Sequence, residues 1–331
     1  MKTNLARFCC LATTALLTFL SATHAGAQTA DAAAYPTRAV RLVVPYGPGG
    51  VSDIIGRVLA QKMSETLGQS MVVDNRAGAG GMVGTGAVAK SAPDGYTLVL
   101  SSLSAYAIGP RMVKAPPYDP VNDFTYISNF AIFPNVLVVH PSLPINNVRE
   151  LVDFAKSNAG KVNMASAGVG STSHLAGTIL TQLGKFEALH VPHKGGGPSV
   201  ASVIAGQTHF TFAPAPAAMS QVKAGRLRAI AHSLPTRSKM LGELPAVNET
   251  LAGYDYSTWA GLLAPKGLAK PMQDRIFAAL QKTLAITAVL DGLAAQGAEV
   301  LLIPGEDYRK FVAQDLIATA KFVQAAGLQA E

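Results

Sequence analysis

The segment that decides the fold is VRLVVPYGPGGVSD, residues 40–53. Its first part, residues 40–45, is an apolar run rich in Val and Leu, which predicts a strand buried on both faces. The glycine-rich stretch at residues 47–50 then ends this strand. From Ile54 to Met63, apolar residues recur at helical spacing, which predicts a helix with one apolar face. A buried strand that turns through glycines into a helix is the opening unit of an α/β fold.

The same alternation continues along the chain. Strands are predicted at residues 71–74 and 96–100, with a small-residue helix at residues 82–90 between them. This order predicts a parallel sheet with helices on both faces. A second unit starts at the strand predicted for residues 136–139. Further strands are predicted at residues 162–166, 188–191, 210–212, 227–231 and 259–263, and further helices at residues 173–183, 198–205, 271–284 and 307–326.

One helix of the second unit has explicit boundary signals. Asn147 precedes Glu150 by three residues, which is the spacing of a helix N-cap and its capping-box partner. Gly160 then supplies a stop, because glycine adopts the left-handed conformation in which many helices end. We therefore expect a capped helix between Asn147 and Gly160.

The first residues of the chain predict export. Lys2 and Arg7 precede an apolar run at residues 8–20, and the small residues before Gln28 fit a signal-peptidase site. The run is shorter than the roughly 20 apolar residues of a membrane-spanning helix. We therefore expect a cleaved signal peptide, residues 1–27, and a mature chain that begins at Gln28.

Composition argues against several classes of function. Cys9 and Cys10 are the only cysteines and lie in the predicted signal, so the mature chain would have no thiol for disulfides, catalysis or metal binding. The 27 basic and 20 acidic residues are scattered. No run of Lys and Arg with interleaved aromatic residues occurs, so we expect no contact with nucleic acid. No later apolar stretch is long enough to cross a bilayer.

Two glycine-rich loops, residues 46–53 and 166–174, each join a predicted strand to a predicted helix. A helix N-terminus carries unpaired backbone N–H groups and a partial positive charge, and glycine lets a ligand approach them closely. Such a loop suits an anion. Each loop also fits a plain capping turn, with Ser52 or Asp53 as the cap in the first, and the residues alone leave both interpretations open. Two such loops, one in each unit, favour a ligand cleft between the units.

Other kinds of site find weaker support. Residues 78–84, GAGGMVG, resemble the dinucleotide fingerprint, but the third glycine is one residue late and no acidic residue is placed for a ribose. His190 and His193 lack a cluster of carboxylates that would complete a metal site. No Gly-x-Ser-x-Gly elbow indicates a hydrolase, and no Gly-Lys-Ser/Thr ending indicates a nucleotide phosphate loop. We therefore expect no metal and no cofactor.

Several longer motifs follow one another along nearly the whole predicted mature chain. They are VPYGPGGVSD at residues 44–53, VDNRAGAGG at 73–81, PDGYTL at 93–98, GSTSHL at 170–175, HVPHKG at 190–195, GRLRA at 225–229 and WAGLLAP at 259–265. In these motifs the chain resembles the Bug family, the substrate-binding proteins of tripartite tricarboxylate transporters. The motifs are specific for the family and not for a ligand.

The resemblance implies an α/β fold like that of type 2 periplasmic binding proteins, with two α/β lobes joined by two crossover segments and a ligand cleft between them. The crossovers are expected near residues 130–135 and 254–259. The expected parts are a signal peptide at residues 1–27, a first lobe at residues 28–131 and 258–331, and a second lobe at residues 132–257. The second lobe would thus be inserted in the first.

The function that the resemblance implies is transport rather than catalysis. A monomeric periplasmic protein would capture a small organic carboxylate, either an aliphatic di- or tricarboxylate or an aromatic carboxylate. It would deliver this ligand to the membrane subunits of the transporter. Two alternatives remain. The first is a sensor that presents its ligand to a receptor kinase, which a neighbouring gene for the kinase or for the transporter would distinguish. The second is an exported hydrolase, which turnover of esters would reveal.

The resemblance also implies which residues bind the ligand. They are Tyr46, Gly47, Gly50, Ser52, Asp53, Ser102 and Ser104 from the first lobe, and Ser166, Gly170, Ser171, His174, His193, Ala213 and Pro214 from the second. Two positions depart from the family, because His193 stands where members often have Tyr, and Ala213-Pro214 stands where many have Asp. We expect the missing carboxylate to disfavour ligands with an ammonium group. We expect His193 to make the affinity depend on pH, because an unperturbed histidine side chain titrates at about pH 6.5.

Overall fold

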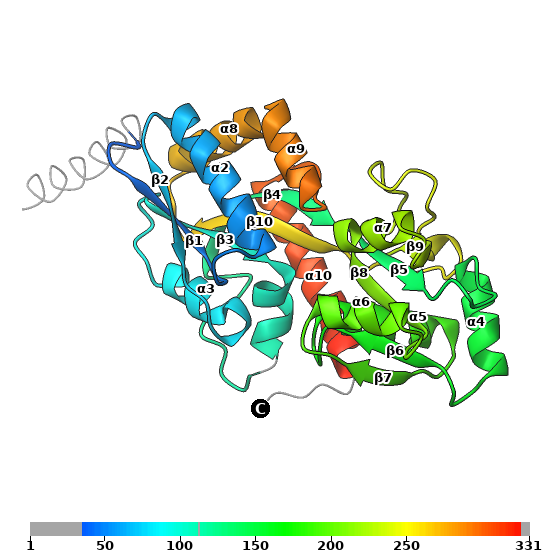
Figure 1. Ribbon diagram of the computed structural model, residues 1–331. Coiled ribbons are helices and arrows are strands. Elements are labelled where there is room, and N and C mark those ends of the chain that lie inside the picture. The colour runs from blue at the N-terminus through cyan, green and yellow to red at the C-terminus, as the bar shows by residue number, and fades with distance from the viewer. Residues whose placement is uncertain (1–34, 112, 326–331) are drawn as a thin grey trace, which may run out of the picture.

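Two β-sheets, each covered by helices, form the two lobes of this computed structural model (Figure 1). The structure describes residues 35–111 and 113–325, so the predicted signal peptide lies outside the described residues. The first sheet has the strand order β11 (Glu299–Pro304), β4 (Phe124–Phe133), β10 (Thr258–Pro265), β3 (Thr97–Ser102), β1 (Val40–Val44) and β2 (Met71–Asn75). The second has the order β7 (Leu189–Pro192), β6 (Asn163–Ser166), β8 (Phe210–Pro214), β5 (Asn135–Val139) and β9 (Arg228–His232).

β1 is buried on both faces, as its apolar sequence predicts. It runs parallel to β2 on one side and to β3 on the other. Leu42 packs in one apolar cluster with Ile55 and Leu59 of the following helix, α2 (Val51–Leu67). Val43 points to the opposite face and joins the other cluster of this sheet. Apart from the exposed Arg41, the side chains of the strand are buried, and the chain turns through the glycine-rich loop to begin α2.

The sheets are mixed rather than parallel. β10 runs antiparallel to β3 and to β4, and β11 runs antiparallel to β4. In the second sheet, β6 is parallel to β7 and β8, but β5 is antiparallel to β8 and β9. The parallel pairing predicted from the first three strands is therefore right for β1, β2 and β3, and the antiparallel pairing of the strands that complete the first sheet was not predicted. β4 was not predicted because Ser128 and Asn129 interrupt its apolar run, although neighbouring strands bury both side chains completely.

Helices cover both faces of each sheet. In the first lobe, α2, α8 (Lys270–Leu284) and α9 (Thr287–Ala295) lie on one face and α3 (Met82–Ala89) and α10 (Gly305–Ala325) on the other (Figure 1). The second lobe has α4 (Val148–Ser157), α5 (Thr172–Gly184), α6 (Gly196–Ile204) and α7 (Ala215–Lys223). In the described part of the chain, no single helix is long and apolar enough to cross a membrane, and only α8 with α9, bent by 81°, passes this test as a pair.

The predicted cap of α4 is confirmed. The side chain of Asn147 accepts a hydrogen bond from the backbone N–H of Glu150 at 2.9 Å. The helix ends at Ser157, before the predicted stop, and Gly160 follows in a turn with a φ of +74°.

The chain passes between the lobes at two places that lie side by side. β4 ends in the first sheet at Phe133 and β5 begins in the second sheet at Asn135, so Pro134 alone links them. On the way back, the chain re-enters the first sheet at Thr258, the first residue of β10. Thr258 pairs with Phe133 in the antiparallel register of β4 and β10. The two crossovers therefore form one two-stranded hinge.

α10 adds a third link between the lobes, through packing. Its residues Tyr308, Val312 and Leu316 are buried in one apolar cluster with Leu137 and Phe212 of the second sheet. α10 also contacts α5 of the second lobe. The C-terminal helix thus runs from the first lobe along the junction and packs against the second lobe (Figure 1).

The contact between β10 and α10 makes Gly261 a sensitive position. A Cβ atom at Gly261 would overlap the phenol group of Tyr308, which is itself completely buried. We expect Gly261→Ala to lower the free energy of unfolding by about 1–3 kcal/mol, the usual cost of overpacking a core. Urea unfolding followed by circular dichroism would measure it. Gly196→Ala is the matched control, because no atom lies within 4 Å of its Cβ position, and equal stability of the two variants would contradict the packing argument.

Candidate functional site

A cavity of about 390 Å³ lies between the two lobes, beside the hinge. The first lobe contributes the β1–α2 loop, the end of β3, the start of β10 and the α9–β11 loop. The second lobe contributes the start of β5, the first residue of α5 and the junction of β8 with α7. This volume suits a small ligand, since pockets for small molecules measure about 300–1,000 Å³. The predicted cleft between the lobes is therefore present.

Hydroxyl groups from two neighbouring strands form part of the first-lobe wall. Tyr46 follows β1 and Ser102 ends β3, and because these strands are adjacent their carboxyl ends meet. Tyr46 OH and Ser102 Oγ are hydrogen-bonded at 2.6 Å, and Ser104 lines the cavity beside them. Burial raises the pKa of the Tyr46 phenol above its ordinary value. At neutral pH this wall therefore presents uncharged hydroxyl groups.

The N-terminus of α2 opens onto the same cavity. Gly50 is the N-cap residue, in extended conformation, and no side chain caps the helix. The first hydrogen bond of the helix is donated by Ile54 N to Gly50 O at 3.0 Å. The N–H groups of Val51 and Ser52 precede this bond and have no acceptor among the described residues, and both residues line the cavity. The positive end of the helix dipole therefore points to the ligand space.

Asp53, one of the predicted ligand residues, lies behind the glycine-rich loop. It does not line the cavity, and it is only 3% exposed. Its carboxylate accepts hydrogen bonds from Gly49 N at 2.9 Å, Arg57 Nε at 3.0 Å and Asn75 Nδ2 at 3.0 Å. These bonds, with that from Arg57 the strongest, lower the pKa of Asp53 to about 2. Asp53 therefore fixes the glycine-rich loop from behind, and Gly50 and Ser52 face the cavity.

The second lobe meets the cavity mainly through residues near the hinge. Asn135 and Pro214, paired in the register of β5 and β8, both line it, and Ala215 and Pro216 begin α7 beside them. Ala215 N donates to Pro134 O at 3.2 Å, and Pro216 has no N–H group. The N-terminus of α7 therefore offers fewer free donors than that of α2.

The second glycine-rich loop reaches the cavity only through Thr172, and its other polar groups bond within the loop or to His190. Ser171 caps α5, because its Oγ accepts from His174 N at 3.3 Å. His174 Nδ1 accepts from Gly170 N at 3.1 Å. Ser166 Oγ and His190 Nε2 are hydrogen-bonded at 2.6 Å. Of the two interpretations that the sequence left open for this loop, the structure favours the capping turn, and Thr172 alone of α5 lines the cavity.

Two histidines stack behind this loop. The rings of His174 and His190 lie 3.8 Å apart and nearly parallel. Burial, and then the neighbouring His190, lower the pKa of His174 to about 4, so His174 is neutral at pH 7. His193 does not line the cavity, so the expected dependence of affinity on pH has no direct contact through which to act. Among the described residues, no group of three or more His, Cys, Asp or Glu is placed to hold a metal ion.

The cavity thus brings together six of the predicted site residues and leaves out eight. Those that line it are Tyr46, Gly50, Ser52, Ser102, Ser104 and Pro214, and those that do not are Gly47, Asp53, Ser166, Gly170, Ser171, His174, His193 and Ala213. Lining residues that were not predicted include Asn135, Thr172, Thr258, Trp259 and Gln296. Most of these lie at the hinge or on distant segments that the fold brings to it, so no local motif marks them. Within the described chain, no charged side chain lines the cavity.

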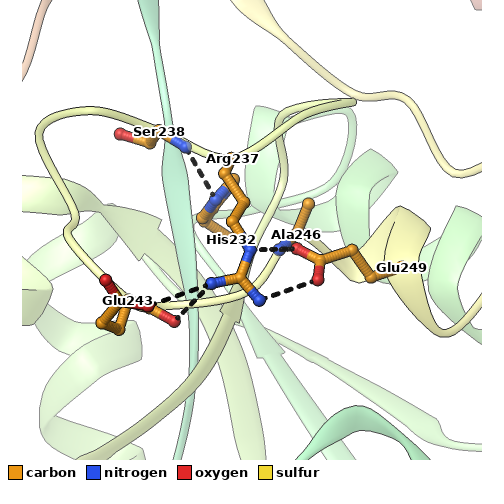
Figure 2. A network of polar contacts seen from close by, with 6 residues as sticks. All are labelled: His232, Arg237, Ser238, Glu243, Ala246 and Glu249. Carbon is orange, nitrogen blue, oxygen red and sulfur yellow. Dashed lines mark hydrogen bonds and ion pairs between the residues drawn. The ribbon is translucent and has the colours of Figure 1, made fainter.

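The lobes also touch beside the cavity. Ser238 Oγ of the second lobe donates to Glu299 Oε1 at the start of β11, and Met240 N donates to the same atom at 3.4 Å. The loop that carries Ser238 is held by a polar network, in which Arg237 bonds both Glu249 oxygens and Ser238 N donates to His232 Nε2 (Figure 2). The second lobe is therefore docked on the first in this structure.

Comparisons with known proteins agree with this architecture. A family model described as "Tripartite tricarboxylate transporter family receptor" matches residues 55–328. Protein BugT of Bordetella pertussis (strain Tohama I) is 36% identical over 318 residues, which cover 95% of this chain and 97% of BugT. Among solved structures, the periplasmic binding protein BugD is 33% identical with a TM-score of 0.71, and an R. palustris protein with adipate is 30% identical with a TM-score of 0.74. Each of these two alignments covers 90% of this chain and 100% of the other chain.

The hydrogen bonds of Asp53 predict a pH-dependent contribution to stability. Because its pKa is lowered from 3.8 to about 2, the carboxylate stabilises the fold by about 2 kcal/mol above pH 4. This contribution is lost as the pH falls from about 4 to about 2. We expect Asp53→Asn to be less stable than the wild type at pH 7, with a difference that shrinks across this window in chemical unfolding. The exposed Asp291, which has no hydrogen bond in the described part, supplies the control Asp291→Asn, and a difference independent of pH would contradict the assignment.

Proposed function

The chain belongs to the Bug family, the receptors of tripartite tricarboxylate transporters, and we propose that it is a periplasmic solute-binding protein that captures a small organic carboxylate for uptake. The ligand class comprises aliphatic di- and tricarboxylates and aromatic carboxylates. One observation carries the proposal: the uncapped N-terminus of α2 opens into a cavity between the lobes whose wall, within the described residues, has no charged side chain.

An uncapped helix end and hydroxyl groups can hold an anion without a cation. The N-terminus of a helix carries roughly half a positive charge, and its free N–H groups donate charge-assisted hydrogen bonds to a carboxylate. Tyr46, Ser52 and Ser104 add hydroxyl donors around it. A carboxylate buried here therefore replaces its water shell with fixed donors.

The same wall disfavours an ammonium group. No Asp or Glu of the described chain lines the cavity, so a ligand amine would lose its hydration without gaining a counter-charge. Pro214, at the position where the sequence is expected to depart from the family pattern, lines the cavity, in keeping with a ligand that lacks an amine. The proposed ligand is therefore an acid without an amine.

The pair of Ser166 and His190, a hydroxyl beside an imidazole, does not support a hydrolase activity. Ser166 Oγ is hydrogen-bonded to His190, but Ser166 is completely buried and neither residue lines the cavity. Burial also lowers the pKa of His190. A substrate in the cavity would not reach this hydroxyl, so we propose capture without turnover.

The wider role follows the family. We propose export by a signal peptide at residues 1–27, action as a monomer and delivery to the membrane subunits of a tripartite tricarboxylate transporter. The proposed lobes are residues 28–131 with 258–331, and residues 132–257. The membership of β5 to β9 in the second sheet and of the other strands in the first sheet supports this division.

A panel of acids tests the ligand class. We expect adipate or benzoate to bind the mature protein, and glutamate and aspartate to bind far more weakly, because the amine has no partner in the cavity. Titration calorimetry at pH 7 measures the affinities, and a thermal-shift screen of further acids extends the panel. Tight binding of glutamate or aspartate would contradict the proposal that the cavity disfavours ligands with an amine.

A proline at the first position of α2 tests the anion site. Val51→Pro removes one N–H donor at a position where helices tolerate proline, and the extended Gly50 before it suits proline as well. We expect the affinity for a bound acid to fall about tenfold or more relative to Val51→Ala, since a hydrogen bond to a charged group contributes about 1.5–3 kcal/mol. Val51→Ala keeps the N–H group and serves as the control. Equal affinities of the two variants would show that this amide does not hold the carboxylate.

A further inference from the structure

Asn135 places a buried amide in the cavity wall at the hinge. It is the first residue of β5 and is only 4% exposed. Its backbone N–H donates to Ser233 Oγ at 3.0 Å and its carbonyl accepts from Ser233 N at 2.9 Å. Because both backbone groups are bonded, the side chain is the part that remains for the cavity. That amide has no hydrogen-bond partner within residues 35–111 and 113–325.

The surroundings make this amide unusual. The next four residues of β5, Val136 to Val139, are apolar and completely buried. Buried side-chain amides in folded proteins nearly always have a partner, since an unpaired one loses its hydration without compensation. The Asn135 amide is not among the enclosed polar atoms that lack a partner, so it remains accessible from the cavity. A ligand that displaces water from this amide must therefore supply a hydrogen bond in its place.

Asn135 lies at the other end of the cavity from the N-terminus of α2. Asn135 follows β4 through Pro134, while Gly50 follows β1, and β10 and β3 lie between these two strands. Three steps between neighbouring strands amount to about 14 Å. A ligand with its carboxylate at α2 would therefore present its far end to Asn135.

This far end suits a neutral group better than a second carboxylate. The neighbouring N-terminus of α7 has its Ala215 N–H bonded to Pro134 O, and Pro216 has none. A side-chain amide offers two donors and one acceptor. A hydroxyl group can use a donor and the acceptor together, whereas a carboxylate can only accept from the N–H groups and would leave the amide oxygen unpaired. Thr258 Oγ, nearby in the hinge, donates to Phe133 O at 2.9 Å and keeps its lone pairs for a second hydroxyl contact.

We propose that Asn135 is a specificity-determining residue that binds a hydroxyl group at the far end of the captured acid, so that the preferred ligand is a hydroxy monocarboxylate. This inference rests on the proposed function, because it takes carboxylate capture at α2 as given. It adds that the second group recognised on the ligand is a hydroxyl and that Asn135 binds it.

Two series of acids that differ only in the far group test the proposal. The first is benzoate, 4-hydroxybenzoate and terephthalate, and the second is hexanoate, 6-hydroxyhexanoate and adipate. In titration calorimetry at pH 7, we expect the hydroxy acid of at least one series to bind the wild type about tenfold more tightly than the other two members, the effect of one satisfied buried hydrogen bond.

Variants of Asn135 assign the preference to this side chain. We expect Asn135→Ala to reduce the affinity for the hydroxy acid about tenfold and to change that for the unsubstituted acid by less than about twofold. Asn135→Leu has a side chain of similar shape without the amide, so a cavity-induced folding defect is not expected. In this variant we expect the unsubstituted acid to bind more tightly than the hydroxy acid. Asn163→Ala is the matched control, because Asn163 begins β6 as Asn135 begins β5 but does not line the cavity.

The outcomes separate this inference from the proposed function. If Asn135→Ala weakens the unsubstituted and hydroxylated acids equally, the residue has only a structural role and the inference fails. Tightest binding of terephthalate or adipate, or no preference within either series, overturns the inference and leaves carboxylate capture intact. If none of the six acids binds the wild type, the proposed function fails and this inference fails with it.

Discussion

The antiparallel pairing of Phe133 with Thr258 fixes where the two lobes meet. Each crossover continues a central strand of the first sheet, so neither can move without the other. Relative motion of the lobes is thereby limited to bending at Pro134 and at the residues just before Thr258. The cavity lies directly at this place. A ligand in it touches both lobes and the hinge, which is the arrangement that lets binding favour a closed form.

The electrostatics of the site follow from helix geometry rather than from charged side chains. β1 is buried except at Arg41, and the chain turns from it through the glycine-rich loop to let α2 begin. This turn leaves the first N–H groups of α2 without acceptors and directs them to the cavity. Asp53, the nearest acidic side chain in the first turn, is occupied with Gly49, Arg57 and Asn75. The Asp53 carboxylate therefore orders the loop from a position outside the cavity wall, where it does not repel an anionic ligand.

The two glycine-rich loops look alike in sequence and differ in use. In the first, Gly50 caps α2 without a side chain, so the helix end stays free. In the second, the Ser171 hydroxyl caps α5 and His174 binds the loop backbone, so its donors are occupied. A single hydroxyl at the N-cap position thus separates an open helix end from a closed one. The second lobe contributes to the cavity through the hinge and the start of α7 instead.

The sequence by itself determined the α/β class, most of the helices and strands, and the first loop of the site. Those features depend on local patterns: the apolar run of residues 40–45, the spacing from Ile54 to Met63, and the pair Asn147 and Glu150. It also identified the family, because its motifs extend along the chain. The mixed order of the sheets, the strand β4 with its buried Ser128 and Asn129, and the lining residues Asn135, Thr258 and Gln296 were decided only in the tertiary structure. The reason is physical: strand pairing and burial depend on partners that are more than 100 residues away for Phe133 and Thr258, and no local pattern of residues encodes which distant strand will cover them.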